Sequence, residues 1–92
     1  MSYKVLFTID ANEDIDKIER SGNKKLLKKL RSLLAELREH PKTGTGKPEQ
    51  LKHYEIPTWS RRISQEHRLI YRIQDEIITV LVLSAYGHYE DK

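Results

Sequence analysis

The residues best suited to chemistry in this chain are four arginines in the stretch WSRRISQEHRLIYR, which runs from Trp59 to Arg72. The stretch otherwise alternates between apolar and polar residues, as strands with one buried face do. Arginine matters here because its planar guanidinium binds phosphate oxygens through two parallel hydrogen bonds and stacks on bases. Two interpretations stay open on this pattern alone, a solvated outer face of a sheet and a surface that holds a phosphodiester.

The stretch is predicted to form two strands, Trp59–Ser64 and Arg68–Ile73. The number of each residue, odd or even, indicates which face of the sheet it occupies. Regular alternation puts the odd-numbered residues on one face and the even-numbered residues on the other. The even-numbered arginines are then expected to project together from the outer face, with Arg61 as the exception on the core side or at an edge. The apolar odd-numbered residues, expected to pack under a helix, are Trp59, Ile63, Leu69, Tyr71 and Ile73.

Other side chains capable of acid–base chemistry lie at the ends of elements that reach this sheet. Glu49 follows a glycine-containing loop, Lys52 and His53 come just after it, and Gly87-His88-Tyr89 lies near the end of the chain. A carboxylate, a histidine and arginines on one face could cleave RNA without a metal. Such a reaction needs a base for the 2′-hydroxyl, cations for the phosphorus oxygens and an acid for the departing 5′-oxygen. The plainer interpretations are a surface glutamate paired with a lysine and a frayed terminus.

Two other kinds of site are rejected on spacing. The segment GTGK from Gly44 to Lys47 resembles part of a phosphate-binding loop, but that motif requires GxxxxGK[ST] between a strand and a helix. Here Pro48 follows the lysine and a strand is predicted next. The histidines are not spaced with carboxylates as metal ligands are, so the sequence predicts neither a metal nor a cofactor.

Length and composition limit the rest of the interpretation. The chain has 92 residues, of which 37% are hydrophobic, so we expect one domain that spans residues 1–92. The 17 Lys and Arg residues exceed the 14 Asp and Glu residues by three, an excess that suits an anionic partner without identifying it. The absence of cysteine fits a reducing compartment, and no apolar run has the length of a signal peptide or membrane span. We therefore predict a soluble cytoplasmic protein with no membrane partner.

The elements that must position these residues begin with a strand and two helices. Residues Tyr3–Ile9 alternate with period two, which is typical of a strand. Asp10 and Glu13 have the spacing of a capping box, and the helix that they begin is expected to end at Ser21-Gly22. A second helix is predicted from Asn23 until Pro41 ends it. Its leucines recur on a single stripe of a 3.6-residue helix, at Leu26, Leu27, Leu30, Leu33, Leu34 and Leu37.

Beyond Pro48 the period changes to two and predicts four more strands. The connections between them are short enough to require antiparallel neighbours. The run IITVLVLSA is apolar at both odd- and even-numbered positions, so both faces of this last strand must be covered. This places the strand in the middle of the sheet. The fold class is therefore α+β, with one N-terminal strand, two helices on one face and four antiparallel strands. The predicted bounds of those four are Leu51–Tyr54, Trp59–Ser64, Arg68–Ile73 and Ile77–Ser84.

Three blocks of the sequence closely resemble the YoeB/Txe branch of the RelE-like bacterial toxins. They are GKPEQLKH at 46–53, WSRRISQEHRLIY at 59–71 and the HY of His88-Tyr89. Their order and separation match over nearly the whole chain. The resemblance implies a RelE-like fold and the toxin of a type II toxin–antitoxin system. It further implies a ribosome-dependent mRNA interferase that inhibits translation.

The resemblance also implies a role for each matching residue. Glu49 is expected to be the general base, Arg68 the phosphate clamp, Arg62 its assistant and His88 the general acid, while Tyr89 orients the substrate or stacks on it. The implied products are a 2′,3′-cyclic phosphate and a 5′-hydroxyl end, formed without a cofactor or metal. The residues expected to bind RNA around this set are Lys47, Lys52, Arg61 and Arg72.

The chain departs from the pattern of that branch in two places. Glu90, Asp91 and Lys92 follow Tyr89, where members of the branch commonly stop, and Tyr86 stands where arginine is frequent. A role for a terminal carboxylate at Tyr89 is therefore not expected. The glutamate, both arginines and the histidine of the pattern are all present, so an active enzyme is predicted.

The partners implied by the resemblance are mRNA in the ribosomal A site, the ribosome and a cognate antitoxin. The antitoxin is expected to cover the basic face with a flexible, acidic and apolar segment, and to connect the toxin to operator DNA. A homodimer through the helical side is a further expectation. Two alternatives stay open: a ParE-like toxin that binds a protein target such as gyrase without catalysis, and a plain RNA-binding module.

Overall fold

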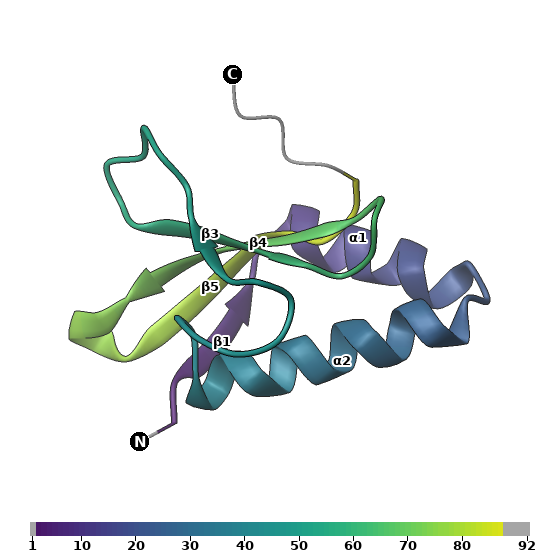
Figure 1. Cartoon of the computed structure of the whole chain (residues 1–92), viewed down its shortest axis with the longest axis horizontal. Helices are drawn as coiled ribbons and strands as arrows, with labels where there is room; N and C mark the ends of the chain where they lie inside the picture. The colour runs from purple at the N-terminus through teal and green to yellow at the C-terminus, as the bar shows by residue number, and fades with distance from the viewer. Residues whose placement is uncertain (1, 88–92) are drawn as a thin grey trace.

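The computed structural model describes residues 2–87, which form two α-helices and a five-stranded mixed sheet. Both helices lie on the same side of the sheet, and the strand order is β1-β5-β4-β3-β2 (Figure 1). The predicted order of one strand, two helices and further strands is confirmed. The elements are β1 (Lys4–Phe7), α1 (Ile9–Arg20), α2 (Lys24–Glu39), β2 (Glu49–Gln50), β3 (Thr58–Arg62), β4 (Arg68–Gln74), the 3₁₀ turn η1 (Asp75–Ile77) and β5 (Thr79–Ser84).

The N-cap of the first helix lies two residues before Asp10, the predicted cap. Thr8 is its N-cap, because the Thr8 hydroxyl accepts a hydrogen bond of 3.0 Å from the Ala11 amide. The same hydroxyl donates to the carbonyl of Leu83 at 3.1 Å, so the helix start is also tied to β5. The prediction of Asp10 as the cap is wrong for this reason. Asp10 lies instead in the first turn, where its charge is favourable near the helix N-terminus.

The leucine stripe of α2 forms the centre of the core, as its spacing predicts. Asn23 caps the helix through the Leu26 amide, and the helix ends at Glu39 before Pro41. The buried leucines pack against the odd-numbered side chains of β4, which confirms the predicted division of faces. A fully buried leucine contributes about 1.5–3 kcal/mol relative to an exposed one. The core residues with no more than 1% exposure include Leu30, Leu33, Leu37, Leu69, Tyr71, Val80 and Val82.

The last strand, β5, lies inside the sheet as its continuous apolar run predicts. It pairs parallel with β1 on one side and antiparallel with β4 on the other. A bulge between Ile70 and Tyr71 shifts the register of β4 against β5. The side chains of Val80 and Val82 join the core under the helices. The sheet therefore has one face covered by α1 and α2, and an opposite face that carries the even-numbered residues of β3 and β4.

The predicted strand Leu51–Tyr54 is wrong. The strand in this region is only Glu49–Gln50, and residues 51–57 form bends that project from the sheet edge (Figure 1). The backbone of His53 is left-handed, with φ of 69°, which an extended strand cannot contain. Pro57 also lacks the amide hydrogen that a strand ladder needs. Glu49 consequently lies within the short edge strand, beside β3.

The loop at residues 41–48, which carries the chain from α2 to Glu49, is seated closely on β3. The carbonyl of Gly46 accepts a hydrogen bond of 2.7 Å from the amide of Arg62. Gly46 has φ of 85°, and a Cβ atom there would lie 2.8 Å from the Arg62 carbonyl oxygen. A glycine is therefore required both by the backbone conformation and by the closeness of the strand.

Replacement of Gly46 should separate these two requirements. Gly46→Ala and Gly22→Ala both force alanine into a left-handed conformation, at a cost of about 1–2 kcal/mol each. A Cβ at Gly22 meets nothing within 4 Å, whereas one at Gly46 meets backbone. We expect Gly46→Ala to lower the free energy of unfolding by about 1–3 kcal/mol more than Gly22→Ala, as overpacking does. Urea denaturation measures both, and equal losses would show that the loop does not depend on its contact with β3.

Candidate active site

The register of the sheet brings Glu49 and three arginines onto the face opposite the helices. Glu49 pairs with Ser60, and Arg62 pairs with Arg68, so each pair points to one side of the sheet. Arg72 lies on the same face, four residues further along β4. Strands are spaced by about 4.8 Å, which puts the Cβ atoms of Glu49 and Arg68 roughly 12 Å apart. The predicted convergence of Glu49, Arg62, Arg68 and Arg72 on one face agrees with this register.

The charged groups on this face differ in how far they are already bonded. Glu49 and Arg62 are exposed, and within residues 2–87 their side chains have no hydrogen bond or ion pair. Arg68 is half-buried, and its Nη1 donates to the carbonyl of Ser64 at 3.0 Å. Arg72 is also half-buried, and its Nε is buried without a partner in the described part of the chain. A carboxylate and a guanidinium therefore face solvent with their bonding capacity available.

Arg61 lies on the core side of β3, with 0% of its surface exposed. Its Nε donates to the hydroxyl of Tyr71 at 3.1 Å, and its Nη1 donates to the carboxylate of Glu36 at 3.0 Å. An RNA phosphate cannot reach this side chain in the fold, so the predicted RNA contact of Arg61 is corrected to a structural role. Its two terminal nitrogens also donate to carbonyls of the loop and the end of α2, at His40, Thr43 and Thr45.

The Arg61 network fixes the loop that leads to Glu49. The Glu36 carboxylate accepts from the Thr45 amide at 2.8 Å as well as from Arg61. Burial raises the pKa of Tyr71 above 10.0 despite the nearby Arg61, so the phenol keeps its proton and donates to the Pro41 carbonyl at 2.8 Å. The Glu36 side chain is 24% exposed, but loss of its charge would leave the fully buried Arg61 guanidinium without its charged partner. The loop that leads to Glu49 is therefore held by residues on the helix-covered face of the sheet, opposite the face that carries Arg62 and Arg68.

The last described residues bring the chain back to Arg68. The Gly87 amide donates to Nδ1 of His67 at 2.8 Å, and the Gly87 carbonyl accepts from the Arg68 amide at 3.0 Å. The Tyr86 ring lies 4.3 Å from the His67 ring, measured between centroids. His88 and Tyr89 follow directly in the sequence but lie outside the described residues. Sequence reasoning did not find this contact, because it joins residues twenty positions apart.

The remaining predicted RNA-binding residues flank Glu49. Lys47 and Lys52 are both exposed, one on each side of β2. Lys47 has a left-handed backbone with φ of 52°, at the point where the loop turns into the strand. Among residues 2–87 no group of three or more histidine, cysteine or acidic side chains has the arrangement of a metal site. No helix in that range is long and apolar enough to span a membrane.

Comparison with known sequences assigns the chain to a family. The sequence profile described as "YoeB-like toxin of bacterial type II toxin-antitoxin system" matches residues 7–89. The chain belongs to this family of toxins. It is 42% identical to Toxin YoeB of Escherichia coli strain K12 over 67 residues, which are 73% of this chain and 77% of that protein. It is also 42% identical to Toxin YoeB of Synechocystis over 71 residues, 77% of this chain and 80% of that one.

Solved structures support the same assignment for this YoeB-like toxin. The YoeB/ParE toxin from Agrobacterium tumefaciens superimposes with a TM-score of 0.84 at 31% identity, over 94% of this chain and 99% of that one. The YoeB dimer from Staphylococcus aureus gives a TM-score of 0.78 at 36% identity, over 97% and 100% of the two chains. The archaeal RelE–RelB complex from Pyrococcus horikoshii gives 0.77 at 14% identity, a likeness of fold alone. The fold of the YoeB-like toxin is RelE-like, as the sequence resemblance predicts.

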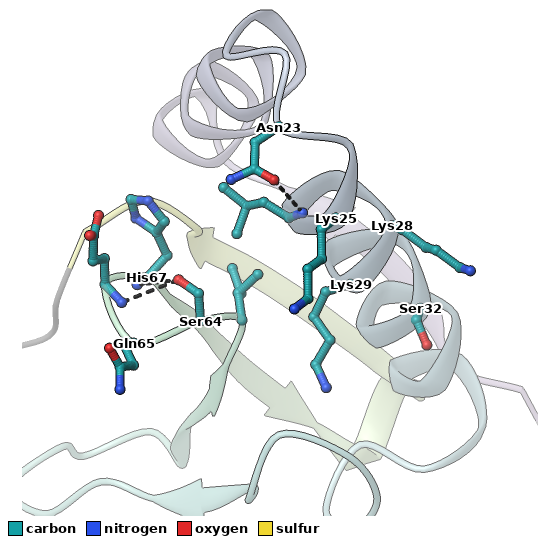
Figure 2. Close-up of a pocket in the computed structure, with 11 residues that line it drawn as sticks. Asn23, Lys25, Lys28, Lys29, Ser32, Ser64, Gln65 and His67 are labelled. Atoms are coloured by element: carbon teal, nitrogen blue, oxygen red, sulfur yellow. Dashed lines mark hydrogen bonds between the residues drawn. The ribbon is translucent and has the colours of Figure 1, made fainter.

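The YoeB-like toxin also has a cleft of about 840 Å³, whose lining includes three lysines and Glu66. It lies between α2 and the turn that joins β3 to β4. Figure 2 shows Lys25 and Lys29 of α2 on one side of it, across from Ser64, Gln65 and His67. The turn that lines the cleft continues directly into Arg68. Cationic side chains of the helix therefore approach the same end of the sheet as the arginine pair.

The charge state of Glu36 decides how firmly the loop of this YoeB-like toxin is held. Burial is the largest single influence and acts to raise the pKa of this carboxyl. The hydrogen bonds from Thr45 and the charge and hydrogen bond of Arg61 together outweigh it, so the pKa lies below its ordinary value of 4.5. A carboxyl whose pKa is lowered in the folded state stabilises the fold fully at pH values above its ordinary pKa. That stabilisation is lost as the pH falls through the folded-state pKa.

Glu36→Gln should therefore destabilise the protein in a pH-dependent way. We expect a loss of about 1.5–3 kcal/mol in the free energy of unfolding at pH 7, typical of hydrogen bonds to a charged group. The difference in the free energy of unfolding between wild type and variant should narrow as the pH falls below 4.5 and through the lower pKa of folded Glu36, because the wild-type carboxylate then takes up a proton. Urea denaturation across this pH range measures the gap.

Asp75→Asn is the matched control for this prediction. Hydrogen bonds from Tyr3 and Lys42 lower the pKa of Asp75, so it titrates in the same acidic window. Asp75 does not contact Arg61. In Asp75→Asn the free energy of unfolding should therefore still fall at the acidic pH at which Glu36 takes up its proton. A gap between wild type and Glu36→Gln that stays constant from pH 7 to pH 3 would contradict the role assigned to the Glu36 charge.

Proposed function

We propose that this YoeB-like toxin is an endoribonuclease that cleaves mRNA on the ribosome without a metal. The observation that carries the proposal is the position of the exposed Glu49 carboxylate, which has no side-chain partner among residues 2–87, on the same open face as exposed and half-buried arginines. The match of Glu49, Arg62 and Arg68 to the blocks shared with the YoeB/Txe branch supports the same assignment. RNA brings its own nucleophile, the 2′-hydroxyl, so the protein needs to supply a base, an acid and positive charge.

The proposed reaction is a transesterification within the RNA. Glu49 takes the proton of the 2′-hydroxyl as the oxygen attacks the adjacent phosphorus, and the bond from phosphorus to the 5′-oxygen breaks. Arg62 and Arg68 stabilise the charge that develops on the non-bridging oxygens. His88 gives a proton to the departing 5′-oxygen. The products are a 2′,3′-cyclic phosphate and a 5′-hydroxyl end, and Tyr89 orients or stacks on the neighbouring nucleotide.

The pairing of Arg62 with Arg68 supports a phosphate between them. The two residues are direct neighbours across the strands, where like charges destabilise a sheet. Neither guanidinium forms an ion pair with an acidic group in residues 2–87. A phosphate oxygen seated between them would offset this repulsion and accept hydrogen bonds from both. Lys47, Lys52 and Arg72 would bind the flanking phosphates.

Ribosome dependence follows from the weakness of the proposed base. A carboxylate is far less basic than the ribose alkoxide that it must help to form, so position has to supply much of the rate. A ribosome that presents the mRNA in a bent form would align the 2′-oxygen, the phosphorus and the 5′-oxygen. The isolated toxin should therefore cleave free RNA slowly.

We also infer that an antitoxin holds this protein inactive in the cytoplasm. The Staphylococcus aureus relatives, at 34–36% identity, are described as a YoeB–YefM complex, a heterotetrameric YoeB–YefM complex and a YoeB dimer. An acidic and apolar segment would suit the basic face and the cleft beside it. By the same comparison we propose a homodimer, and a link to operator DNA through the antitoxin.

Substitution of the proposed acid and base should abolish cleavage without abolishing binding. Glu49→Gln and His88→Gln remove the proposed acid–base group at each position and leave every arginine of the chain unchanged. We expect a loss of at least about 100-fold in cleavage, the usual contribution of a general acid or base, with association to ribosomes retained. Primer extension on a translated message measures cleavage, and co-sedimentation measures association. Loss of association in both variants would instead identify them as binding residues.

Addition of ribosomes should decide between the proposed enzyme and its alternatives. We expect wild-type protein to cut a message much faster during translation than as naked RNA, because the ribosome aligns the substrate. Mapped RNA ends should carry a 5′-hydroxyl. Equal rates with and without ribosomes would contradict the ribosome-dependent mechanism. Steeply salt-dependent binding with no scission would favour an RNA-binding module, and no RNA effect at all would favour a ParE-like toxin.

A further inference from the structure

We infer that His67 is a positioning residue for the proposed reaction, because its ring fixes the point from which the chain delivers His88. The inference rests on the proposed function, in which His88 protonates the leaving oxygen. His67 itself is 9% exposed and lies on the helix-side cleft, not on the arginine face. It therefore acts through Gly87 and does not touch the substrate.

Residues 85–87 are held at consecutive points after β5 ends at Ser84. The Ala85 amide donates to the Asp14 carboxylate at 3.0 Å, which ties the segment to α1. The Tyr86 ring packs on the His67 ring on one side and lies 5.3 Å from Nζ of Lys17. Tyr86 is the residue where the related branch frequently has arginine, so this chain places an aromatic contact at that position.

The neighbouring residues His67 and Arg68 hold both polar groups of the Gly87 peptide backbone. His67 Nδ1 accepts from the Gly87 amide at 2.8 Å, and the Arg68 amide donates to the Gly87 carbonyl at 3.0 Å. Gly87 is therefore tied to the backbone of the proposed phosphate clamp, and His88 is the next residue in the sequence.

The contact with Gly87 also defines the form of the imidazole. A backbone amide can only donate, so Nδ1 must be the unprotonated nitrogen. In the form that makes this contact, the ring proton is on Nε2. A residue that replaces His67 must offer an acceptor at the δ position to keep the bond. The carbonyl oxygen of asparagine is at that position, whereas the amide of glutamine is one bond further from Cα and leucine has no acceptor.

The test compares three substitutions at His67 in the full chain. We expect His67→Leu and His67→Gln to lower the single-turnover cleavage rate by about 100-fold, the loss that a displacement of about 1 Å can cause, with the ribosome affinity unchanged. His67→Asn should restore the rate to within about tenfold of wild type, because the acceptor is retained. Glu76→Gln, exposed in the 3₁₀ turn after β4 and outside both this contact and the cleft, is the control and should cleave like wild type.

A spectroscopic measurement tests the contact apart from catalysis. In ¹⁵N-labelled protein, a coupling through the hydrogen bond between the Gly87 amide nitrogen and His67 Nδ1 should be detected, together with the chemical shifts of the Nε2-protonated ring. Both signals are expected in His88→Gln, which cannot cleave. Absence of the coupling in folded wild-type protein would overturn the inference.

The outcomes separate this inference from the proposed function. If wild-type protein did not cleave a translated message at all, the proposed function would fail. If wild type cleaved and folded His67→Leu cleaved equally well, His67 would have no positioning role while the function remained. If folded His67→Asn were as slow as His67→Leu, the acceptor at the δ position would not be what matters, and the inference would again be overturned.

Discussion

The buried guanidinium of Arg61 joins the parts of this protein that the site requires. It bonds to Glu36 on α2, to Tyr71 on β4 and to the carbonyls of the loop that precedes Glu49. A buried cation with one of these partners missing would be strongly unfavourable, so the helix, the sheet and the loop must come together in one arrangement. The placement of Glu49 on the open face follows from a contact made on the opposite face.

The two ends of the proposed site depend on two different anchors. The loop before Glu49 is held from the core by Arg61, and the segment before His88 is held by His67 and the backbone of Arg68. Both anchors lie on strands β3 and β4 or on the turn between them. Residues far apart in the chain are therefore anchored to the same hairpin of β3 and β4. This hairpin also carries the two arginines that we assign to the phosphate. Precise placement is what a reaction with a weak carboxylate base would need.

Adjacent arginines in this sheet have opposite uses. Arg61 is fully buried and bonded to the protein, whereas Arg62 is exposed and within residues 2–87 has no side-chain partner. Alternation along a strand produces this difference, because successive residues point to opposite faces. A double arginine in a half-buried strand thus supplies one structural cation and one cation for a ligand. The open basic face and the basic cleft along α2 together suit an anionic macromolecule and an acidic inhibitor alike.

The sequence by itself determined the periodic features of this protein. Hydrophobic spacing located α2, the alternation in β3 and β4 assigned the arginines to their faces, and the apolar run placed β5 inside the sheet, because each of these depends only on local geometry. Tertiary structure decided the cap of α1 at Thr8, the bends at residues 51–57, the bonding partners of Arg61 and the bond of His67 to Gly87. Each of these depends on a partner distant in the sequence, and no local pattern encodes the identity of that partner.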